Sequence, residues 1–161
     1  MLITCLRHAT AEPTILNKED SERALIKKGR EQTKRVAEFC RKNALTPSVL
    51  YSSPLRRAQQ TANSLHSGLI DCPPPTTVEW LSPDQPSEMI VSELKQLEGA
   101  GVDDVWLVGH EPNLSRLIGN LLDVDGECLQ IKKASLTRLQ IDFSGKTAAR
   151  LLWLIPCALM R

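Results

Sequence analysis

Val105-Trp106-Leu107-Val108-Gly109-His110-Glu111-Pro112 joins a continuous apolar run to a glycine and then to a histidine. Apolar residues in a row, without alternation, are typical of a central strand of a parallel sheet that is buried on both faces. A helix is expected after Pro112, extending to about Leu122. His110 therefore follows the end of a buried strand and precedes a helix.

Strands and helices alternate on either side of this stretch. Further strands are expected at residues 3–6, 48–51 and 76–78, and helices at residues 25–42, 53–65 and 87–98. Ser53 is expected to be the N-cap of the second helix, with Pro54 at its first position. Residues 135–143 and 149–155 are expected to pair as a hairpin around a turn at Ser144-Gly145-Lys146. The pattern predicts an α/β fold, a three-layer sandwich around a mainly parallel sheet with an antiparallel C-terminal hairpin.

The composition limits the class of protein. A chain of 161 residues is expected to form one domain, here residues 1–161. Its 20 Lys and Arg against 19 Asp and Glu give a net charge of +1, which argues against a basic nucleic-acid-binding stripe. No apolar stretch approaches the ~18 residues of a membrane span, and the N-terminus lacks the basic region of a signal peptide. We therefore expect a cytoplasmic protein without a nucleic-acid or membrane partner.

Neither disulfides nor metal sites are indicated. The five cysteines are scattered, without a Cys-x-x-Cys pair. Asp103-Asp104 is a pair of carboxylates, but it precedes the apolar strand and is expected to be solvated at the opposite edge of the sheet. We therefore expect no metal and no other cofactor.

Reactive residues follow three of the expected strands. Arg7-His8 comes directly after the first strand, Arg57 lies in the first turn of the helix after the second, and His110 follows the central run. Ligands of open α/β sheets bind beyond the carboxyl ends of the parallel strands. Two guanidiniums, two imidazoles and the N-termini of the two following helices suit a doubly charged tetrahedral anion. The sequence therefore predicts a site for phosphate or a phosphoryl group.

Histidine is the expected nucleophile, since the chain has neither a P-loop nor a Cys-x5-Arg phosphatase loop. Neutral imidazole attacks phosphorus readily, and the phosphoramidate that forms is labile enough to hydrolyse. Arginines can hold the equatorial oxygens without a metal ion. We expect one ring nitrogen of His8 to donate to a backbone carbonyl, and Arg7 and Arg57 to lower the pKa of its imidazole.

Four ordered motifs resemble those of the histidine phosphatase superfamily. Arg7-His8-Ala9 is similar to its Arg-His-Gly motif, whose histidine is phosphorylated during turnover. Residues 53–62, Ser-Pro-Leu-Arg-Arg-Ala-Gln-Gln-Thr-Ala, resemble the second arginine motif, in which the arginine before alanine (Arg57) binds phosphate. Residues 108–112 resemble the second-histidine motif. Residues 20–29, Asp-Ser-Glu-Arg-Ala-Leu-Ile-Lys-Lys-Gly, are similar to the Asp-x-x-Arg-Pro-Leu-Thr-x-x-Gly segment of the short branch, the SixA-type phosphohistidine phosphatases.

The resemblance extends from residue 1 to about residue 122 and implies a phosphoglycerate-mutase-like fold. It implies a metal-independent phosphatase with His8 as nucleophile and Arg7, Arg57 and His110 as the phosphoryl clamp. The implied substrate is phosphohistidine in a signalling protein. The elements expected between Arg57 and His110 leave no room for the helical cap of larger members. The alternatives are a small-molecule phosphatase or mutase of the same superfamily, and a catalytically silent module that binds phosphate or a partner.

The roles of the flanking charges stay open. Glu79, after the third strand, and Glu12, in the loop after the first, are candidates for the general acid. The nitrogen leaving group of a phosphohistidine protonates easily and can depart without a dedicated acid. Asp20 and Arg23 are expected to support the site from behind, and Arg56 is expected to lie at the surface.

Overall fold

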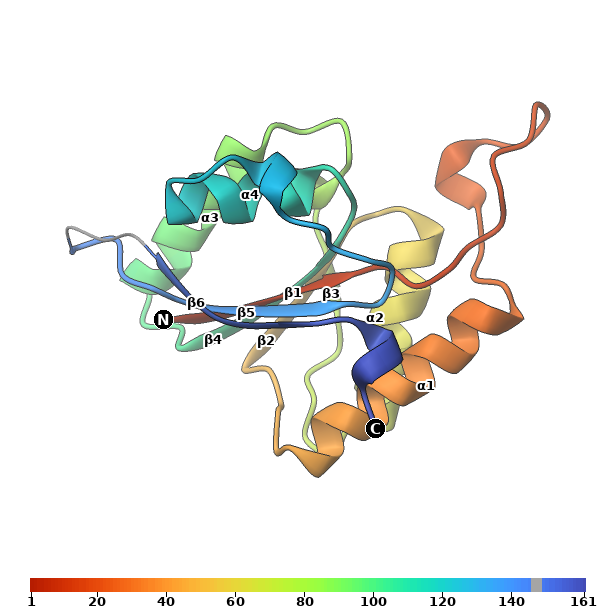
Figure 1. The fold of residues 1–161 in the computed structure, drawn as a ribbon, viewed down its shortest axis with the longest axis horizontal. Helices are drawn as coiled ribbons and strands as arrows, with labels where there is room; N and C mark the ends of the chain where they lie inside the picture. The colour runs from red at the N-terminus through yellow and green to blue at the C-terminus, as the bar shows by residue number, and fades with distance from the viewer. Residues whose placement is uncertain (146–148) are drawn as a thin grey trace.

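A mixed sheet forms the middle layer of the structure, a computed structural model that describes residues 1–145 and 149–161 (Figure 1). The strand order is β3-β2-β4-β1-β5-β6. The strands are β1 (Leu2–Arg7), β2 (Val49–Ser52), β3 (Thr76–Thr77), β4 (Asp104–Gly109), β5 (Leu136–Ile141) and β6 (Ala149–Ile155). The first four strands in this order pair in parallel, whereas β5 pairs antiparallel with both β1 and β6. The predicted α/β sandwich with an antiparallel C-terminal hairpin is confirmed.

Helices cover both faces of the sheet (Figure 1). One face carries α1 (Lys27–Lys42) and α2 (Arg56–Gly68), and the other carries α3 (Ser87–Gly99) and α4 (Asn113–Leu122). Short 3-10 turns complete the described chain: η1 (Asp20–Glu22), η2 (Glu79–Leu81), η3 (Gly126–Cys128) and η4 (Cys157–Leu159). In the part of the chain that the structure describes, no helix is long and apolar enough to cross a membrane.

The central strand β4 is buried on both faces, as its apolar run predicts. Trp106 and Val108 belong to the core under α1 and α2, whereas Val105 and Leu107 belong to the core under α3 and α4. All four side chains are fully buried. The alternation of a strand sends successive side chains into opposite layers, so β4 fixes both helical layers to one sheet.

Two helices begin later than predicted. Ser53 and Pro54 were expected to start the second helix, but α2 begins at Arg56 and its N-cap is Leu55. The Ser53 hydroxyl accepts the Leu55 amide at 3.3 Å and contacts the ring of His110, so it is turned into the site instead of capping a helix. The first helix begins at Lys27 because Leu25 is drawn into an isolated bridge with Ala11.

The prediction that Asp103-Asp104 is solvated was wrong for Asp104. Its carboxylate accepts Arg138 Nη2 at 2.6 Å and the indole nitrogen of Trp106 at 3.1 Å. Arg138 is only 8% exposed, and it also donates to Thr4 Oγ1 at 2.6 Å. A buried guanidinium requires an anion, and the pairing of β1 with both β4 and β5 brings Asp104 to Arg138.

The predicted turn of the C-terminal hairpin falls partly outside the described residues, because Lys146 is not among them. Ser144 and Gly145 follow β5 in a turn, where the Ser144 amide donates to Asp142 Oδ1 at 2.9 Å.

At Gly29, helix α1 comes close to the loop that follows His8. A Cβ atom at this position would lie 2.0 Å from the carbonyl oxygen of Thr10. The same oxygen accepts the amide of Ile26 at 3.2 Å. The absence of a side chain at Gly29 thus allows the start of α1 to hold this loop in place.

We expect Gly29→Ala to lower the free energy of unfolding by about 2 kcal/mol, because the new methyl group would overlap the Thr10 carbonyl. This loss would outweigh the gain of ~1 kcal/mol that alanine brings to a helix. Gly99→Ala, at the end of α3, is the control, since its Cβ would meet no atom within 4 Å. Urea unfolding at a constant m-value measures both variants. A Gly29→Ala protein as stable as the wild type would contradict the close approach.

Candidate active site

The carboxyl ends of β1, β4 and β2 lie side by side and carry the groups that the sequence singled out. The amide of His8 donates to the carbonyl of Gly109, and the amide of Ser53 donates to that of Val108, each at 3.0 Å. Arg57 lies in the first turn of α2, directly after β2. The structure therefore brings Arg7, His8, Arg57 and His110 to one edge of the sheet.

The two imidazoles face each other with ring centroids 5.0 Å apart. The Nδ1 atom of His8 lies 2.7 Å from the carbonyl oxygen of Ala9, so it carries the proton and donates, as predicted. The lone pair is then on Nε2, the atom that would attack phosphorus. Burial of the ring, which is only 6% exposed, and the charges of Arg57, Lys133 and Arg7 together lower the pKa of His8 to about 4, although the hydrogen bond to the Ala9 carbonyl acts in the opposite direction. The arginines act in the expected direction, but burial is the larger cause.

His110 is held by the Ser53 hydroxyl, which lies 2.7 Å from its Nε2 atom. Because Ser53 Oγ accepts the amide of Leu55, its proton is free to be donated to Nε2. The His110 proton is then on Nδ1. Burial, followed by the neighbouring His8 and Arg57, lowers the pKa of His110 to about 3. This ring is therefore a neutral hydrogen-bond donor at pH 7.

Three buried nitrogen atoms at this edge have no hydrogen-bond partner within residues 1–145 and 149–161. They are Nε of Arg7, Nε of Arg57 and Nδ1 of His110. Buried donors are rarely left unpaired in folded proteins. These three unpaired donors suit an oxyanion bound beside the lone pair of His8 Nε2.

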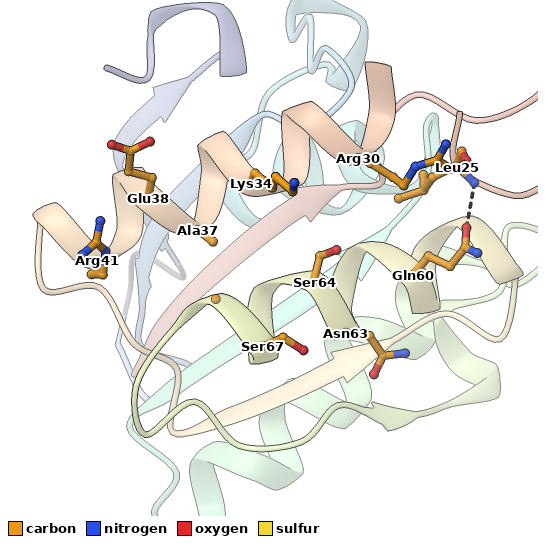
Figure 2. Close-up of a pocket in the computed structure, with 11 residues that line it drawn as sticks. Leu25, Arg30, Lys34, Ala37, Glu38, Arg41, Gln60, Asn63, Ser64 and Ser67 are labelled. Carbon is orange, nitrogen blue, oxygen red and sulfur yellow. Dashed lines mark hydrogen bonds between the residues drawn. The ribbon is translucent and has the colours of Figure 1, made fainter. Parts of the chain in front are cut away.

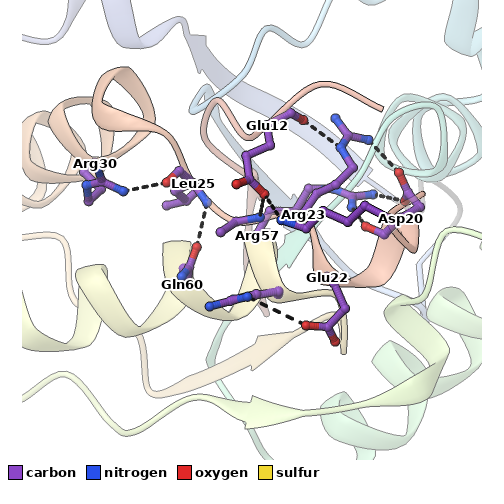
Figure 3. A network of polar contacts seen from close by, with 11 residues as sticks. Glu12, Asp20, Glu22, Arg23, Leu25, Arg30, Arg57 and Gln60 are labelled. Carbon is purple, nitrogen blue, oxygen red and sulfur yellow. Dashed lines mark hydrogen bonds and ion pairs between the residues drawn. The ribbon is translucent and has the colours of Figure 1, made fainter. Parts of the chain in front are cut away.

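A polar network behind Arg57 fixes its guanidinium (Figure 3). Arg57 Nη1 donates to the Asp20 carbonyl at 2.6 Å, and Nη2 donates to the Asp20 carboxylate at 2.7 Å. Arg23 donates to the other carboxylate oxygen at 2.6 Å and, through Nε, to the carbonyl of Glu12 at 2.7 Å. Although partial burial raises the pKa of Asp20, the hydrogen bonds from Arg23 and Arg57 hold it below its ordinary value. Asp20 therefore contacts both arginines, and the supporting role expected of Asp20 and Arg23 stays a prediction.

The two candidate acids are placed differently. The Glu12 carboxylate is bound by Lys18 and by the amide of Ala24, contacts that lower its pKa and tie the loop between β1 and α1 together. Glu79 begins η2, directly after β3, at the same edge of the sheet as the histidines. Its side chain is exposed and makes no hydrogen bond or ion pair within the described chain. Of the two candidates, Glu79 is therefore the one whose carboxylate is not engaged by another described residue.

Arg56 is half-exposed, and its guanidinium lies 3.7 Å from Glu22 at the surface, as expected. The N-terminus of α4 is less open than expected, because Glu111 Oε1 accepts the amide of Ser115 at 3.2 Å. The backbone groups of α2 remain available, since α2 has no side-chain cap.

Sequence reasoning missed Thr61 and Lys133. Thr61 accepts the amide of Ala9 at 3.1 Å and donates to the carbonyl of Arg57 at 2.7 Å. Its position one helical turn after Arg57 is the signal that could have identified it. Lys133 adds a positive charge near His8, and nothing in its local sequence indicates this.

A groove of about 840 Å³ lies away from these residues, between α1 and α2 (Figure 2). At one end, the amide of Leu25 donates to Gln60 Oε1 at 2.7 Å and its carbonyl accepts Arg30 at 2.6 Å. At the other end, Glu38 is paired with Lys42 at 2.9 Å. None of the histidines lines this groove, so its volume does not make it the candidate active site.

Comparisons with known proteins agree with this geometry. Residues 3–81 match the family model described as the histidine phosphatase superfamily (branch 1). An uncharacterized protein of Picosynechococcus sp. is 31% identical over 135 residues, which cover 83% of this chain and 81% of that protein. The protein histidine phosphatase SixA, solved with tungstate, has a TM-score of 0.89 at 19% identity, with 100% of both chains covered. The α-ribazole phosphatase from Shigella flexneri has a TM-score of 0.75 at 17% identity, covering 98% of this chain and 97% of that one. The fold is phosphoglycerate-mutase-like, as predicted.

The buried histidines make stability depend on pH. The unfolded chain binds a proton on each histidine near pH 6.5, whereas the folded chain does so near pH 4 at His8 and near pH 3 at His110. Between these values the unfolded state binds more protons, so the free energy of unfolding falls as the pH falls. We expect a slope of up to about 1.4 kcal/mol per pH unit for each histidine. Urea unfolding at pH 7, 6 and 5 measures it, and His110→Gln should reduce the slope. An equal slope in that variant would contradict the depressed pKa.

Proposed function

The chain belongs to the histidine phosphatase superfamily, and from this premise we propose that it is a phosphatase that transfers a phosphoryl group to His8 and then to water. The observation that carries the proposal is the set of unpaired buried donors beside the free Nε2 atom of His8. An enzyme of this kind differs from a silent phosphate-binding module in having a neutral nucleophile within the anion site. The tungstate bound by SixA, a tetrahedral oxyanion, is a ligand of the shape that this site would accept.

In the first step, Nε2 of His8 attacks phosphorus, the N–P bond forms and the bond to the leaving group breaks. The Ala9 carbonyl holds the Nδ1 proton and stabilises the positive charge that develops on the ring. Arg7, Arg57 and His110 donate to the equatorial oxygens, where negative charge must be stabilised. The hold of Ile131 on Arg7 and of Asp20 on Arg57 supports this role, because a side chain fixed in advance needs little reorganisation.

In the second step, water attacks the phosphorus of phosphohistidine, the N–P bond breaks and inorganic phosphate is released. We assign to Glu79 the proton exchange in both steps, to the leaving group and then from the water. Glu12 is engaged by Lys18 and Ala24, which leaves it holding the loop. A nitrogen leaving group would make the first of these transfers less demanding.

We assign phosphohistidine on another protein as the substrate, with residues 1–161 forming one domain without a cap. The stretch between Arg57 and His110 is occupied by α2, β3, η2, α3 and β4. Residues 82–86, the connection nearest the site, are held by Asn113, which donates to the Gln85 carbonyl at 2.8 Å. No segment of this stretch within the described residues is available as a lid. An uncovered site gives a small ligand few enclosing contacts, but it admits a side chain presented by another protein.

The covalent step predicts that brief exposure to labelled substrate, followed by quenching, leaves phosphate on His8. The label should be lost in acid and survive alkali, as expected of a phosphoramidate. Tryptic mapping by mass spectrometry at alkaline pH identifies the site. Undiminished turnover in His8→Ala, or an unlabelled wild-type protein, would falsify the mechanism.

Arg57 and Arg56 provide a matched pair of controls for this step. Arg57→Ala should slow labelling by ~10²-fold, in line with the loss of one preorganised charge. Arg56→Ala should change it little, because Arg56 lies at the surface beside Glu22. Labelling should persist in a chelator, since no group of three or more His, Cys, Asp and Glu residues in the described chain is arranged to bind a metal.

The substrate assignment predicts that kcat/KM on a phosphohistidine protein exceeds that on sugar or glycerate phosphates by ~10²-fold, about 2.7 kcal/mol of transition-state preference. Phosphate release from both substrate classes under the same conditions measures this ratio. Equal efficiency on a small phosphate ester would favour the alternative function, a small-molecule phosphatase, and would leave the histidine mechanism in place.

A further inference from the structure

A second cavity, of about 490 Å³, adjoins the candidate active site. It lies between the first half of α1, the turn at residues 132–133 and the C-terminal segment, which Figure 1 shows beside α1. Four cationic side chains line it: Lys28, Arg35, Lys132 and Lys133. Glu31 is the carboxylate among the described lining residues. We call this cavity the basic recess.

Two of the segments that line the basic recess are connected to His8. Thr10, which lines it, is two residues after His8. The turn that carries Lys133 is fastened to the end of β1, because Arg7 Nη1 donates to the Ile131 carbonyl at 2.7 Å and the Ala134 amide donates to the Arg7 carbonyl at 3.0 Å. Lys133 is therefore held at the boundary between the recess and the phosphoryl site.

The four cations of the recess outnumber the one carboxylate, Glu31, among its described lining residues. Within residues 1–145 and 149–161, no ion pair of 4.0 Å or less involves any of its four cations. Farther along the same helix, Lys42 does pair with Glu38. Burial and the charges of Arg7, Arg23, Arg57 and Lys28 lower the pKa of Lys133, as expected of like charges held together. A bound anion would relieve this repulsion.

We propose that the basic recess binds acidic side chains of the protein that presents the phosphorylated residue to His8. This inference rests on the proposed function and narrows its substrate to phosphohistidine with carboxylates nearby. Lys28 and Arg35 are seven residues apart on α1, so the recess extends for about 10 Å along the helix. That length exceeds a three-carbon phosphate ester whose phosphoryl group is at His8, and it suits several carboxylates along a polypeptide.

Two phosphohistidine peptides test the proposal. One carries glutamate at the positions on both sides of the phosphohistidine, and the other carries glutamine at the same positions. We expect the wild-type kcat/KM to be about tenfold higher for the glutamate peptide at low ionic strength. Added salt should reduce the ratio, because exposed charges are screened. A ratio taken within one protein is independent of any general loss of activity or of folded material.

Two double variants test whether the cations of the recess cause the preference for the glutamate peptide. Lys28→Gln/Lys133→Gln should lower the ratio to about two or less. Arg41→Gln/Lys42→Gln removes the same charge from the end of α1, outside the recess, and should retain the wild-type ratio. Equal hydrolysis of both peptides by the wild type, or an equal fall of the ratio in the control variant, would overturn the proposed role of the recess. Neither result would contradict the proposed phosphatase activity.

Hydrolysis of neither peptide would overturn the proposed function instead. In that case, binding of the unphosphorylated glutamate peptide tests the recess alone, through the amide chemical shifts of Thr10 and Lys133 in NMR titration. Shifts that disappear in Lys28→Gln/Lys133→Gln would support the recess as an acidic-peptide site. The absence of shifts in the wild type would overturn it.

Discussion

Two imidazoles are kept neutral beside guanidinium groups, and the rest of the site depends on this constraint. A histidine in water would be partly protonated near pH 6.5, and an imidazolium has no lone pair with which to attack phosphorus. Burial removes the water that stabilises the cation, which is why the pKa of His8 falls to about 4. Burial also requires the ring nitrogens to have hydrogen-bond partners. The Ala9 carbonyl accepts the Nδ1 proton of His8, and the Ser53 hydroxyl contacts Nε2 of His110. The arrangement of the proposed nucleophile and clamp thus depends on the packing of β1, β2 and β4.

Asp20 shows how the protein keeps a guanidinium paired in this environment. An arginine side chain has five N–H donors in a fixed plane. Asp20 accepts from Nη1 and Nη2 of Arg57, which leaves Nε without a partner in the described chain. Arg23 holds Asp20 from the other side and is itself tied to Glu12. The carboxylate therefore positions Arg57, at the cost of some repulsion toward an incoming dianion, and half of its surface remains in water to screen that repulsion.

The parts of the site that the sequence predicted are those governed by local pattern. Reactive residues after buried runs must meet at one edge once the strands are parallel, so the placement of His8 and His110 followed from their position in the chain. Contacts between segments that are distant in the chain have no corresponding pattern in the local sequence. The pairing of Asp104 with Arg138 depends on strand register across 34 residues. The position of Lys133 depends on a hydrogen bond across 124 residues, from Arg7 to Ile131.

The net charge of the whole chain does not indicate the local cluster of cations on α1. The chain carries a charge of +1, yet α1 alone holds seven basic and two acidic residues. One cation of the recess acts on His8, since Lys133 helps to lower the pKa of its imidazole. An acidic partner that neutralises Lys133 would raise that pKa. Burial is the larger cause of the depression, however, and a pKa of about 4 leaves a margin of about three pH units below neutrality. Pairing of Lys133 with an acidic substrate of the kind proposed would therefore leave His8 unprotonated at neutral pH.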